Sequence, residues 1–194
     1  MLAFLFLPQS VTADAKSQIN LVRLSIAHVY SSSGRKGSHG IQKVFDGTTT
    51  TSWVSSDHDP WVRVRFTKPV TVESIAIHAD SEIKPSSPPS YFQVHLRHLG
   101  EKQFIDYPLI KAQNPTSSYI LPQPVEDIRD VWITFPSASP IHIDEIEILG
   151  QPAQGTVLTE VVPKIDPTGE SFVRELRKIE KRAIHREEKF LKKL

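Results

Sequence analysis

Oxygen-bearing side chains gather in one short stretch of the sequence. Asp46-Gly47 is a turn signal, because glycine permits a positive φ and the aspartate can accept hydrogen bonds from nearby backbone amides. The four threonines at 48–51 follow directly and supply hydroxyl and carbonyl oxygens. Trp53 then closes the stretch with a large apolar side chain that can anchor the loop in a core. A loop held at both ends in this way is a suitable place for a binding site.

A second polar group, Asp57-His58-Asp59, has the residue types of general acid–base catalysis. Adjacent loop residues seldom point at one centre, and the sequence contains no Gly-x-Ser-x-Gly, no His-Glu-x-x-His and no phosphate-binding glycine loop. It also contains no cysteine, which excludes a thiol nucleophile, a disulfide framework and a cysteine metal site. Because no nucleophile can be paired with a base, the sequence predicts a non-catalytic protein.

Short strands must position these loops. Residues 61–66 alternate strictly, with Val62, Val64 and Phe66 on one face and Trp61, Arg63 and Arg65 on the other. Residues 91–98 alternate as well, which directs Phe92, Val94 and Leu96 to the core and Gln93, His95 and Arg97 outward. The histidines His78, His95 and His98 lie on a predicted strand or at its end and are expected to be solvent-exposed. The sequence has 15 prolines against 8 glycines, which suits a β-protein with stiff loops. Further strands are predicted over 19–26, 72–77, 103–107, 118–121, 131–135 and 141–149, and a short helical turn over 41–45.

Four motifs in this order resemble the discoidin family, also called the coagulation-factor type C domain, a branch of the galactose-binding-like jelly rolls similar to carbohydrate-binding module family 32. They are Asp46-Gly47 with Thr51-x-Trp53, Trp61-Val-x-Val64, Lys68-Pro69-Val70 with the strand after it, and the glutamate-rich last strand 143–150 that ends in glycine. The resemblance covers residues 19–150 and implies an all-β, antiparallel jelly-roll β-sandwich over 16–150. Within it, Trp53 and Trp61 are expected in the core.

The resemblance also implies a metal site. The family often carries a structural calcium ion under the loop that starts at Asp-Gly, and the matching ligands here are Asp46, the oxygens of Thr48 and Thr51, and Glu145. A hard cation takes six to eight oxygen ligands, which such a loop could supply. This sequence departs from the family at Thr48, where an Asp or Asn is more frequent. The alternative is that Asp46 only caps the turn and Glu145 is an exposed strand residue.

A sugar site in this family lies on the loops at one end of the sandwich. Its residue types are explained by carboxylate and arginine contacts with neighbouring hydroxyls and by stacking of the sugar ring on an aromatic face. The loops 31–40 and 55–60 are therefore expected to lie side by side. The alternative for each candidate is a solvated loop side chain. The candidates are Arg35, His39, Asp57, His58, Asp59 and Tyr91.

The two ends of the chain differ from the predicted sandwich. Residues 1–15 combine an apolar run with the small-x-small pattern Ala13-Asp14-Ala15, which predicts a signal segment and a secreted or periplasmic protein. The alternative is an apolar N-terminus that packs on the domain.

Residues 151–170 contain three prolines and are interpreted as a linker laid partly along the domain. Residues 171–194 have an apolar stripe among nine Lys/Arg and four Glu, which predicts a basic amphipathic helix.

The leading hypothesis is non-catalytic binding of a carbohydrate or another extracytoplasmic surface ligand. The alternative is an assembly or interaction subunit in which helix 171–194 docks a protein partner or an anionic surface and the sandwich is a scaffold. The net charge of +1 gives no indication of nucleic-acid binding, and no apolar run is long enough for a transmembrane segment.

Overall fold

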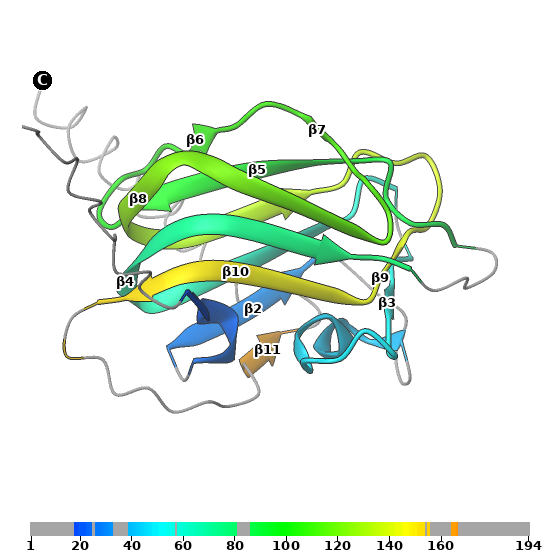
Figure 1. Cartoon of the computed structure of the whole chain (residues 1–194), viewed down its shortest axis with the longest axis horizontal. Coiled ribbons are helices and arrows are strands. Elements are labelled where there is room, and N and C mark those ends of the chain that lie inside the picture. The colour runs from blue at the N-terminus through cyan, green and yellow to red at the C-terminus, as the bar shows by residue number, and fades with distance from the viewer. Residues whose placement is uncertain are drawn as a thin grey trace, which may run out of the picture.

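The computed structural model describes residues 18–24, 26–32, 39–56, 58–80, 86–153 and 155, and the backbone of 164–166. These residues form mainly antiparallel strands in a curled sheet (Figure 1), which confirms the antiparallel β prediction. The predicted signal segment 1–15 and the predicted helix 171–194 lie outside the described residues. In the described part, no helix has the length and apolar character needed to cross a membrane.

Two long strands run through the whole sheet. β4 (Trp61–His78) and β8 (Thr116–Thr134) pair with each other from end to end, in antiparallel register. The register shifts three times between Arg65 and Ser74, and such irregularities bend a strand. The predicted strands 61–66 and 72–77 are therefore two halves of one bent strand, with Pro69 at the bend, where a missing backbone donor disturbs the ladder least.

The bend divides the sheet into two layers. In the first layer, the opening half of β4 lies between β2 and the last residues of β8, and β8 in turn pairs with β5. The strand β11, which falls within the predicted linker, pairs in parallel with β2. The elements that join β4 and β8 in this layer are β2 (Ala27–Ser31), β5 (Tyr91–His98), β6 (Ile105–Asp106), β7 (Ile110–Lys111) and β11 (Lys164–Asp166).

In the second layer, the closing half of β4 lies between the first part of β8 and β10 (Glu145–Pro152), and β1 (Ile19–Asn20) pairs with β10. The predicted first strand 19–26 is wrong beyond Asn20, because the Asn20 side chain accepts a hydrogen bond from the Val22 amide and caps a 3-10 turn, η1 (Leu21–Arg23). A second 3-10 turn, η3 (Ile41–Phe45), confirms the predicted helical turn. Next to it, β3 (Trp53–Val54) pairs with β9 (His142–Ile143).

The core lies between the two layers. Alternation at the start of β4 and along β5 buries one face of each strand, as predicted. Trp53 is fully buried in this core, but Trp61 is not part of it. The expectation of a core Trp61 is wrong, because alternation places it with Arg63 and Arg65 on the outer face, where it is only half-buried. Within the predicted strands, the structure buries Phe66, Ile75, Ile77, Val94, Val131, Ile133 and Ile143.

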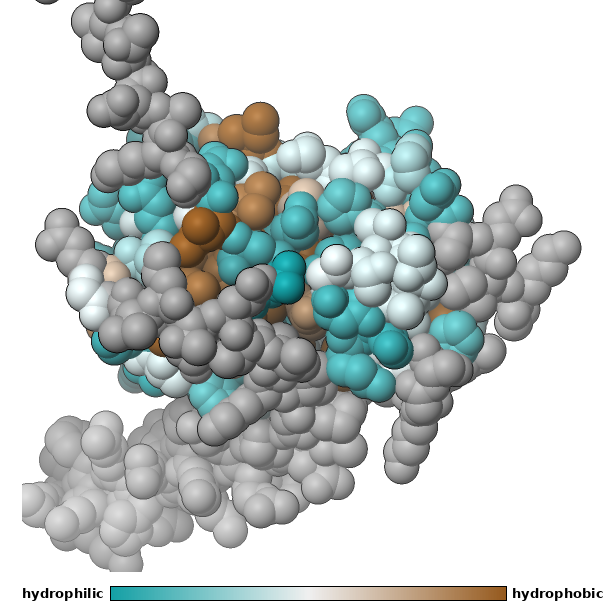
Figure 2. All heavy atoms as spheres, turned by 60° about the horizontal axis from the view of Figure 1, so that its bottom comes forward, coloured by the Kyte–Doolittle hydropathy of each residue, from teal (hydrophilic) through white to brown (hydrophobic). Residues whose placement is uncertain are grey.

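A few large apolar side chains remain exposed at the surface, among them Ile120 and Leu109. On the side drawn in Figure 2, hydrophobic side chains gather in a narrow area that hydrophilic residues border and interrupt. Apolar residues scattered in this way are ordinary for a folded protein.

Candidate functional site

The turn at Asp46 is held by its own carboxylate. Oδ1 of Asp46 accepts a hydrogen bond from the Thr48 amide at 3.2 Å, and Oδ2 accepts one from Oγ1 of Thr51 at 2.7 Å. The Lys43 ammonium lies 3.5 Å from the same Oδ2. Gly47 has a φ of 79°, and a β-carbon there would meet the Arg23 guanidinium at 2.9 Å. The turn therefore needs glycine both for its backbone and for the space that Arg23 fills.

Glu145 reaches this turn from the start of β10. It is only 4% exposed, and its Oε2 accepts a hydrogen bond from the Gly47 amide at 3.2 Å. Its Oε1 is buried with no hydrogen-bond partner among the described residues. Burial raises the pKa of Glu145 to about 8, and the nearby Asp46 and Glu147 add to the rise. The alternative of an exposed strand residue is therefore wrong for Glu145.

These residues fit a calcium ion in part. Asp46 and Glu145 both bond within this turn, and the Thr51 hydroxyl donates to Asp46, whereas the Thr48 hydroxyl lies 2.8 Å from that of Thr50. Carboxylate and hydroxyl oxygens are among the ligands that calcium takes. A cation would also satisfy the buried Oε1 of Glu145 and lower its pKa. No cluster of three or more His, Cys, Asp or Glu is present in the described ranges, so the remaining ligands would be hydroxyl and carbonyl oxygens. Arg23 already brings a positive charge near Glu145.

Three loops are tied together at the end of the sandwich where β4 begins. The Phe135 amide donates to the Pro60 carbonyl at 2.9 Å, and the Ser55 amide donates to the Ile141 carbonyl at 2.9 Å. Asp59 and Ser137 are joined twice, through the Asp59 amide at 3.0 Å and through Oδ1 of Asp59 at 2.9 Å. The Ser87 amide donates to the Pro140 carbonyl at 3.4 Å. We call the region formed by residues 55, 56, 58–60, 86–90 and 135–141 the loop end.

The predicted sugar-binding residues that the structure describes lie at or near this end but bond to different neighbours. Nδ1 of His39 lies 3.3 Å from the Ser52 carbonyl, whereas His58 is exposed and Asp59 is held by Ser137 with a φ of 47°. Tyr91 is 41% exposed at the start of β5. Arg35 and Asp57 lie outside the described residues.

The loop from residue 31 starts beside the loop end. The Trp61 amide donates to Oγ of Ser32 at 3.1 Å, and the Ser32 amide donates to the Trp61 carbonyl at 3.0 Å. Ser32 therefore lies beside the first residue of β4, directly after the loop 55–60, and the expected contact between the loops 31–40 and 55–60 stays a prediction. That contact would involve residues 33–38, which lie outside the described part.

A buried polar network supports the loops from below. Asp144 is fully buried, and its two carboxylate oxygens accept hydrogen bonds from Oγ of Ser52 and, at 2.7 Å, from the Asp80 amide. The sequence analysis did not single out Asp144 as a structural residue, because the family resemblance pointed to the neighbouring Glu145 instead. The network joins Ser52, just after the Asp46 turn, to Asp80, just after the end of β4.

An arginine cluster lies on the outer face of the first layer, and sequence reasoning missed it as a unit. Asp130 on β8 is fully buried and accepts hydrogen bonds from arginines on both neighbouring strands. Arg63 contacts its Oδ1 at 2.6 and 2.9 Å, Arg65 contacts the same oxygen at 3.0 Å, and Arg97 contacts Oδ2 at 2.6 and 3.0 Å. Burial by itself would raise the pKa of Asp130, but Arg63 and the other arginines hold it below the usual value.

Aromatic rings adjoin this arginine cluster. Trp132 packs against His95, Phe104 and Trp61, with ring centroids 5.1, 5.6 and 6.2 Å away. Nδ1 of His95 lies 2.7 Å from Oδ1 of Asp106, and its Nε2 lies 3.2 Å from Oγ1 of Thr134. The expectation that His95 is a solvent-exposed side chain is therefore wrong.

Comparison with known structures identifies the fold. The F5/8 type C domain of a Bacteroides fragilis protein superimposes with a TM-score of 0.60 at 16% identity, over 70% of this chain and 97% of that one. A family 32 carbohydrate-binding module from C. perfringens, solved with galactose, gives 0.55 at 17% identity over 66% and 96%. A fucolectin from striped bass (Morone saxatilis) serum gives 0.57 at 18% identity over 72% and 52%. The chain thus has the discoidin-like, galactose-binding-like fold that the motifs predicted.

Comparison of sequences gives a family. The family model described as anaphase-promoting complex, subunit 10 (APC10) matches residues 8–106, just over half of the chain. No curated protein sequence matches the chain.

Proposed function

The chain belongs to the anaphase-promoting complex subunit 10 (APC10) family, and from this premise and its discoidin-like fold we propose that it is a non-catalytic binding module for a carbohydrate. The observation that carries the proposal is the loop end. Its loops are cross-linked by hydrogen bonds and present His58, Asp59 and Tyr91 to solvent. Such a rigid base lets the side chains bind a ligand with little loss of conformational entropy.

The chemistry of these side chains suits a sugar. A carboxylate and an imidazole can bond to neighbouring hydroxyls, and the exposed ring of Tyr91 can stack against the apolar face of a sugar ring. One similar structure was solved with galactose, and another is a fucolectin. Both are below 25% identity, so they support the fold directly and the ligand class only by analogy.

Calcium and export are parts of the same proposal. Asp46, Thr48, Thr51 and Glu145 would hold a structural calcium ion that fixes the turn next to β3. A carbohydrate on a cell surface would be met outside the cytoplasm, which agrees with the predicted signal segment 1–15. The mass of the mature chain after expression in an exporting host would show whether that segment is removed.

The test is glycan binding by the full chain and by a loop variant. Replacing Arg35, His39 and His58 with alanine should abolish binding on a glycan array, and a melting temperature that changes by only a few degrees would show that the fold is kept. The matched control replaces His98 and Arg129, at the opposite end of the sandwich, and should bind as the wild type does. Equal binding by the loop variant and the wild type would contradict the proposal.

The family match favours a second candidate, a non-catalytic subunit of a protein assembly. The matched residues 8–106 lie in the sandwich side of the chain and include none of the predicted helix 171–194. A subunit role would therefore be carried by the sandwich and not by the helix.

Size-exclusion chromatography of the tagged chain from its own cells distinguishes the subunit role from the sugar-binding role. A stable complex that persists in the loop variant and in free galactose supports the subunit role and argues against the sugar site.

A further inference from the structure

A histidine lies buried beside the loop end. His142 is only 1% exposed. Its neighbours Ile141 and Ile143 belong to the hydrophobic core, so alternation along the chain directs the His142 side chain to the opposite side of β9. Neither nitrogen of its ring makes a hydrogen bond of ordinary geometry within the described part of the chain. The imidazole is therefore held in a place that water does not reach.

β9 lies between β3 and residues 86–90, at one end of the molecule (Figure 1). On one side, His142 pairs with Val54 of β3. On the other side, the His142 amide donates to the Ser87 carbonyl at 3.0 Å, and Ser87 forms a parallel bridge with Ile141. The backbone of His142 thus joins β3 to a segment of the loop end.

Of these two neighbours of β9, residues 86–90 are held more weakly. The Ser87 amide makes a hydrogen bond of 3.4 Å, which is long, and residues 88 and 89 are prolines, which have no amide to donate. β3, in contrast, is anchored by the fully buried side chain of Trp53. Residues 86–90 should therefore separate from β9 with a smaller loss of stability than β3.

The surroundings of the ring offer little compensation for a positive charge. β3, residues 86–90 and residues 136–140 contain no titratable side chain. Asp144 lies near enough to attract a charged ring, but its carboxylate already accepts a hydrogen bond from the amide of the exposed Asp80 at 2.7 Å. A charged ring in this position would gain its missing hydrogen bonds from water, which requires that the covering segment move away.

Burial lowers the pKa of His142 below its ordinary value of 6.5. Asp144 and the Ser86 backbone act in the opposite direction and do not offset the burial. Above pH 6.5 the ring is neutral whether it is covered or open to water. Between pH 6.5 and the lowered value, a ring open to water holds the proton and a covered ring does not, so acid favours the open form.

We propose that His142 is a pH switch for the loop end: when its buried ring takes up a proton, residues 86–90 separate from β9 and the loop end releases its ligand. The release of ligand rests on the proposed function, because Tyr91, on whose ring the sugar would stack, follows directly after residues 86–90. The separation from β9 does not rest on it. Binding is therefore strong near neutral pH and weak in acid.

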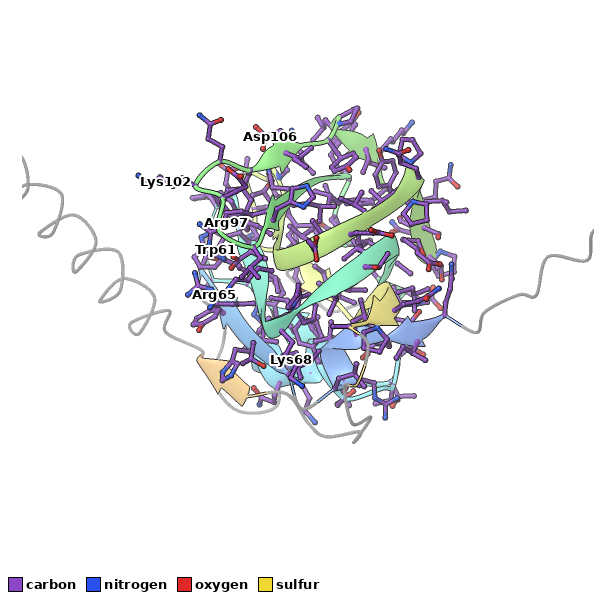
Figure 3. The ribbon with its side chains drawn as sticks, turned by 90° about the vertical axis from the view of Figure 1, so that its left-hand side faces the viewer. Trp61, Arg65, Lys68, Arg97, Lys102 and Asp106 are labelled. Atoms are coloured by element: carbon purple, nitrogen blue, oxygen red, sulfur yellow. The ribbon has the colours of Figure 1, made fainter. Side chains whose placement is uncertain are left out.

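Amide hydrogen exchange of the full chain, followed by NMR between pH 7.5 and 5, measures the separation without a ligand. After correction for the intrinsic pH dependence of exchange, protection of the His142 amide should fall by at most about tenfold per pH unit below about pH 6.5, because one proton is taken up. The Leu99 amide donates to the Asp127 carbonyl at 2.9 Å at the opposite end of the sandwich and should keep its protection. Lys102, labelled in Figure 3, belongs to the turn after β5 at that end.

His142→Leu removes the titrating ring and keeps a buried side chain of similar size. In this variant, the amide at position 142 should be protected equally at pH 7.5 and pH 5. His98→Leu makes the same change at the opposite end and should behave as the wild type does. If His142→Leu did not fold, the wild type decides: the pH at which NMR shows the His142 ring taking up its proton must match the pH at which its amide loses protection.

Glycan arrays at pH 7.5 and 5.5 measure the effect on binding. The wild type should bind about tenfold more weakly at pH 5.5, and His142→Leu should bind equally at both. A fall that His142→Leu retains would belong to His39 or His58 and would refute control by His142. If the wild type bound no glycan at pH 7.5, the proposed function would fail, and hydrogen exchange would still decide whether the loop end opens. Protection at His142 that is independent of pH, or that is lost equally at Leu99, would overturn the switch.

Discussion

At the scale of single residues, the most informative group is the carboxyl of Glu145. It lies 98 positions from Gly47 in the sequence and still accepts a hydrogen bond from the Gly47 amide. One of its oxygens is buried without a partner among the described residues, and Asp46 is close enough to raise its pKa. A proton and a cation are therefore alternative ways to neutralise the same carboxyl.

Without calcium, Glu145 should make the fold less stable as pH rises. Its pKa is about 8 in the folded chain against 4.5 when unperturbed. Below about pH 4.5, both the folded and the unfolded chain hold the proton of Glu145. Between pH 4.5 and 8, only the unfolded chain releases it, which favours unfolding, so the stability that the protonated carboxyl contributes is lost by pH 8. Glu145→Gln cannot ionise, so in EDTA its free energy of unfolding should exceed that of the wild type progressively across this window, by at most about 1.4 kcal/mol per pH unit. Denaturant titrations at pH 4, 6 and 8 measure the difference, and pH profiles that stay parallel would contradict it.

With calcium, the pH dependence should reverse. Calcium that binds the folded chain raises the melting temperature by mass action, and it binds better once Glu145 has lost its proton. We expect the rise to be larger at pH 8 than at pH 5 and to be absent in Asp46→Ala. Thermal melts with calcium and with EDTA measure it, and Asp106→Ala serves as a control carboxylate on the other layer. A wild-type melting curve that calcium leaves unchanged at pH 8 would exclude the metal site.

That Asp46 and Glu145 meet at one turn could be predicted from the sequence, and the arginine cluster could not. Asp46 and Glu145 each lie in a local motif whose order along the chain carries the resemblance. Arg63 and Arg97 were correctly assigned to the outward faces of their strands by alternation. Their convergence on Asp130 depends on which strands are neighbours and in what register, which no local pattern contains.

At the scale of elements, the sequence predicted which segments form strands better than it predicted where each strand begins and ends. Residues 61–66 and 72–77 have the pattern of two separate strands, because each alternates over a length typical of a whole strand. The structure joins them, since the bulges around Pro69 let β4 pass from one layer to the other while it stays paired with β8. Asn20 similarly ends the first strand early by capping a 3-10 turn, a contact that hydrophobic periodicity does not reveal.

Gly150 should be required for the pairing of β10 with β4. The register of this pair shifts between Leu149 and Gly150, and a β-carbon on Gly150 would lie 2.0 Å from the carbonyl oxygen of Thr71. Because the obstacle is backbone, Gly150→Ala must displace a strand, and we expect it to lower the free energy of unfolding by about 3 kcal/mol or more. Gly100→Ala is the control: its φ of +84° strains an alanine but no atom lies within 4 Å, so about 1–2 kcal/mol is expected. Equal effects of the two changes, measured by urea titration, would contradict the close contact.

At the scale of the whole molecule, both layers are built from the same two strands. β4 contributes its first half to one layer and its second half to the other. β8 pairs with it in antiparallel register, so the last half of β8 lies in the first layer and its first half in the second. Neither layer can lose its central strands without exposing the core side chains of the other. The sandwich should therefore unfold in one cooperative transition.

A single tryptophan reporter tests this cooperativity. In the variant Trp61→Phe/Trp132→Phe, the remaining Trp53 is fully buried where β3 pairs with β9, away from the long strands that dominate the far-ultraviolet circular dichroism signal. Because Trp53 packs in the same core as the side chains of β4 and β8, its fluorescence and the circular dichroism should change at the same urea concentration and with the same slope. The circular dichroism of the wild-type chain is the control for damage by the two substitutions. If Trp53 fluorescence changed at a clearly lower urea concentration, the loop end would unfold by itself, and the rigid base on which the proposed sugar site depends would be refuted.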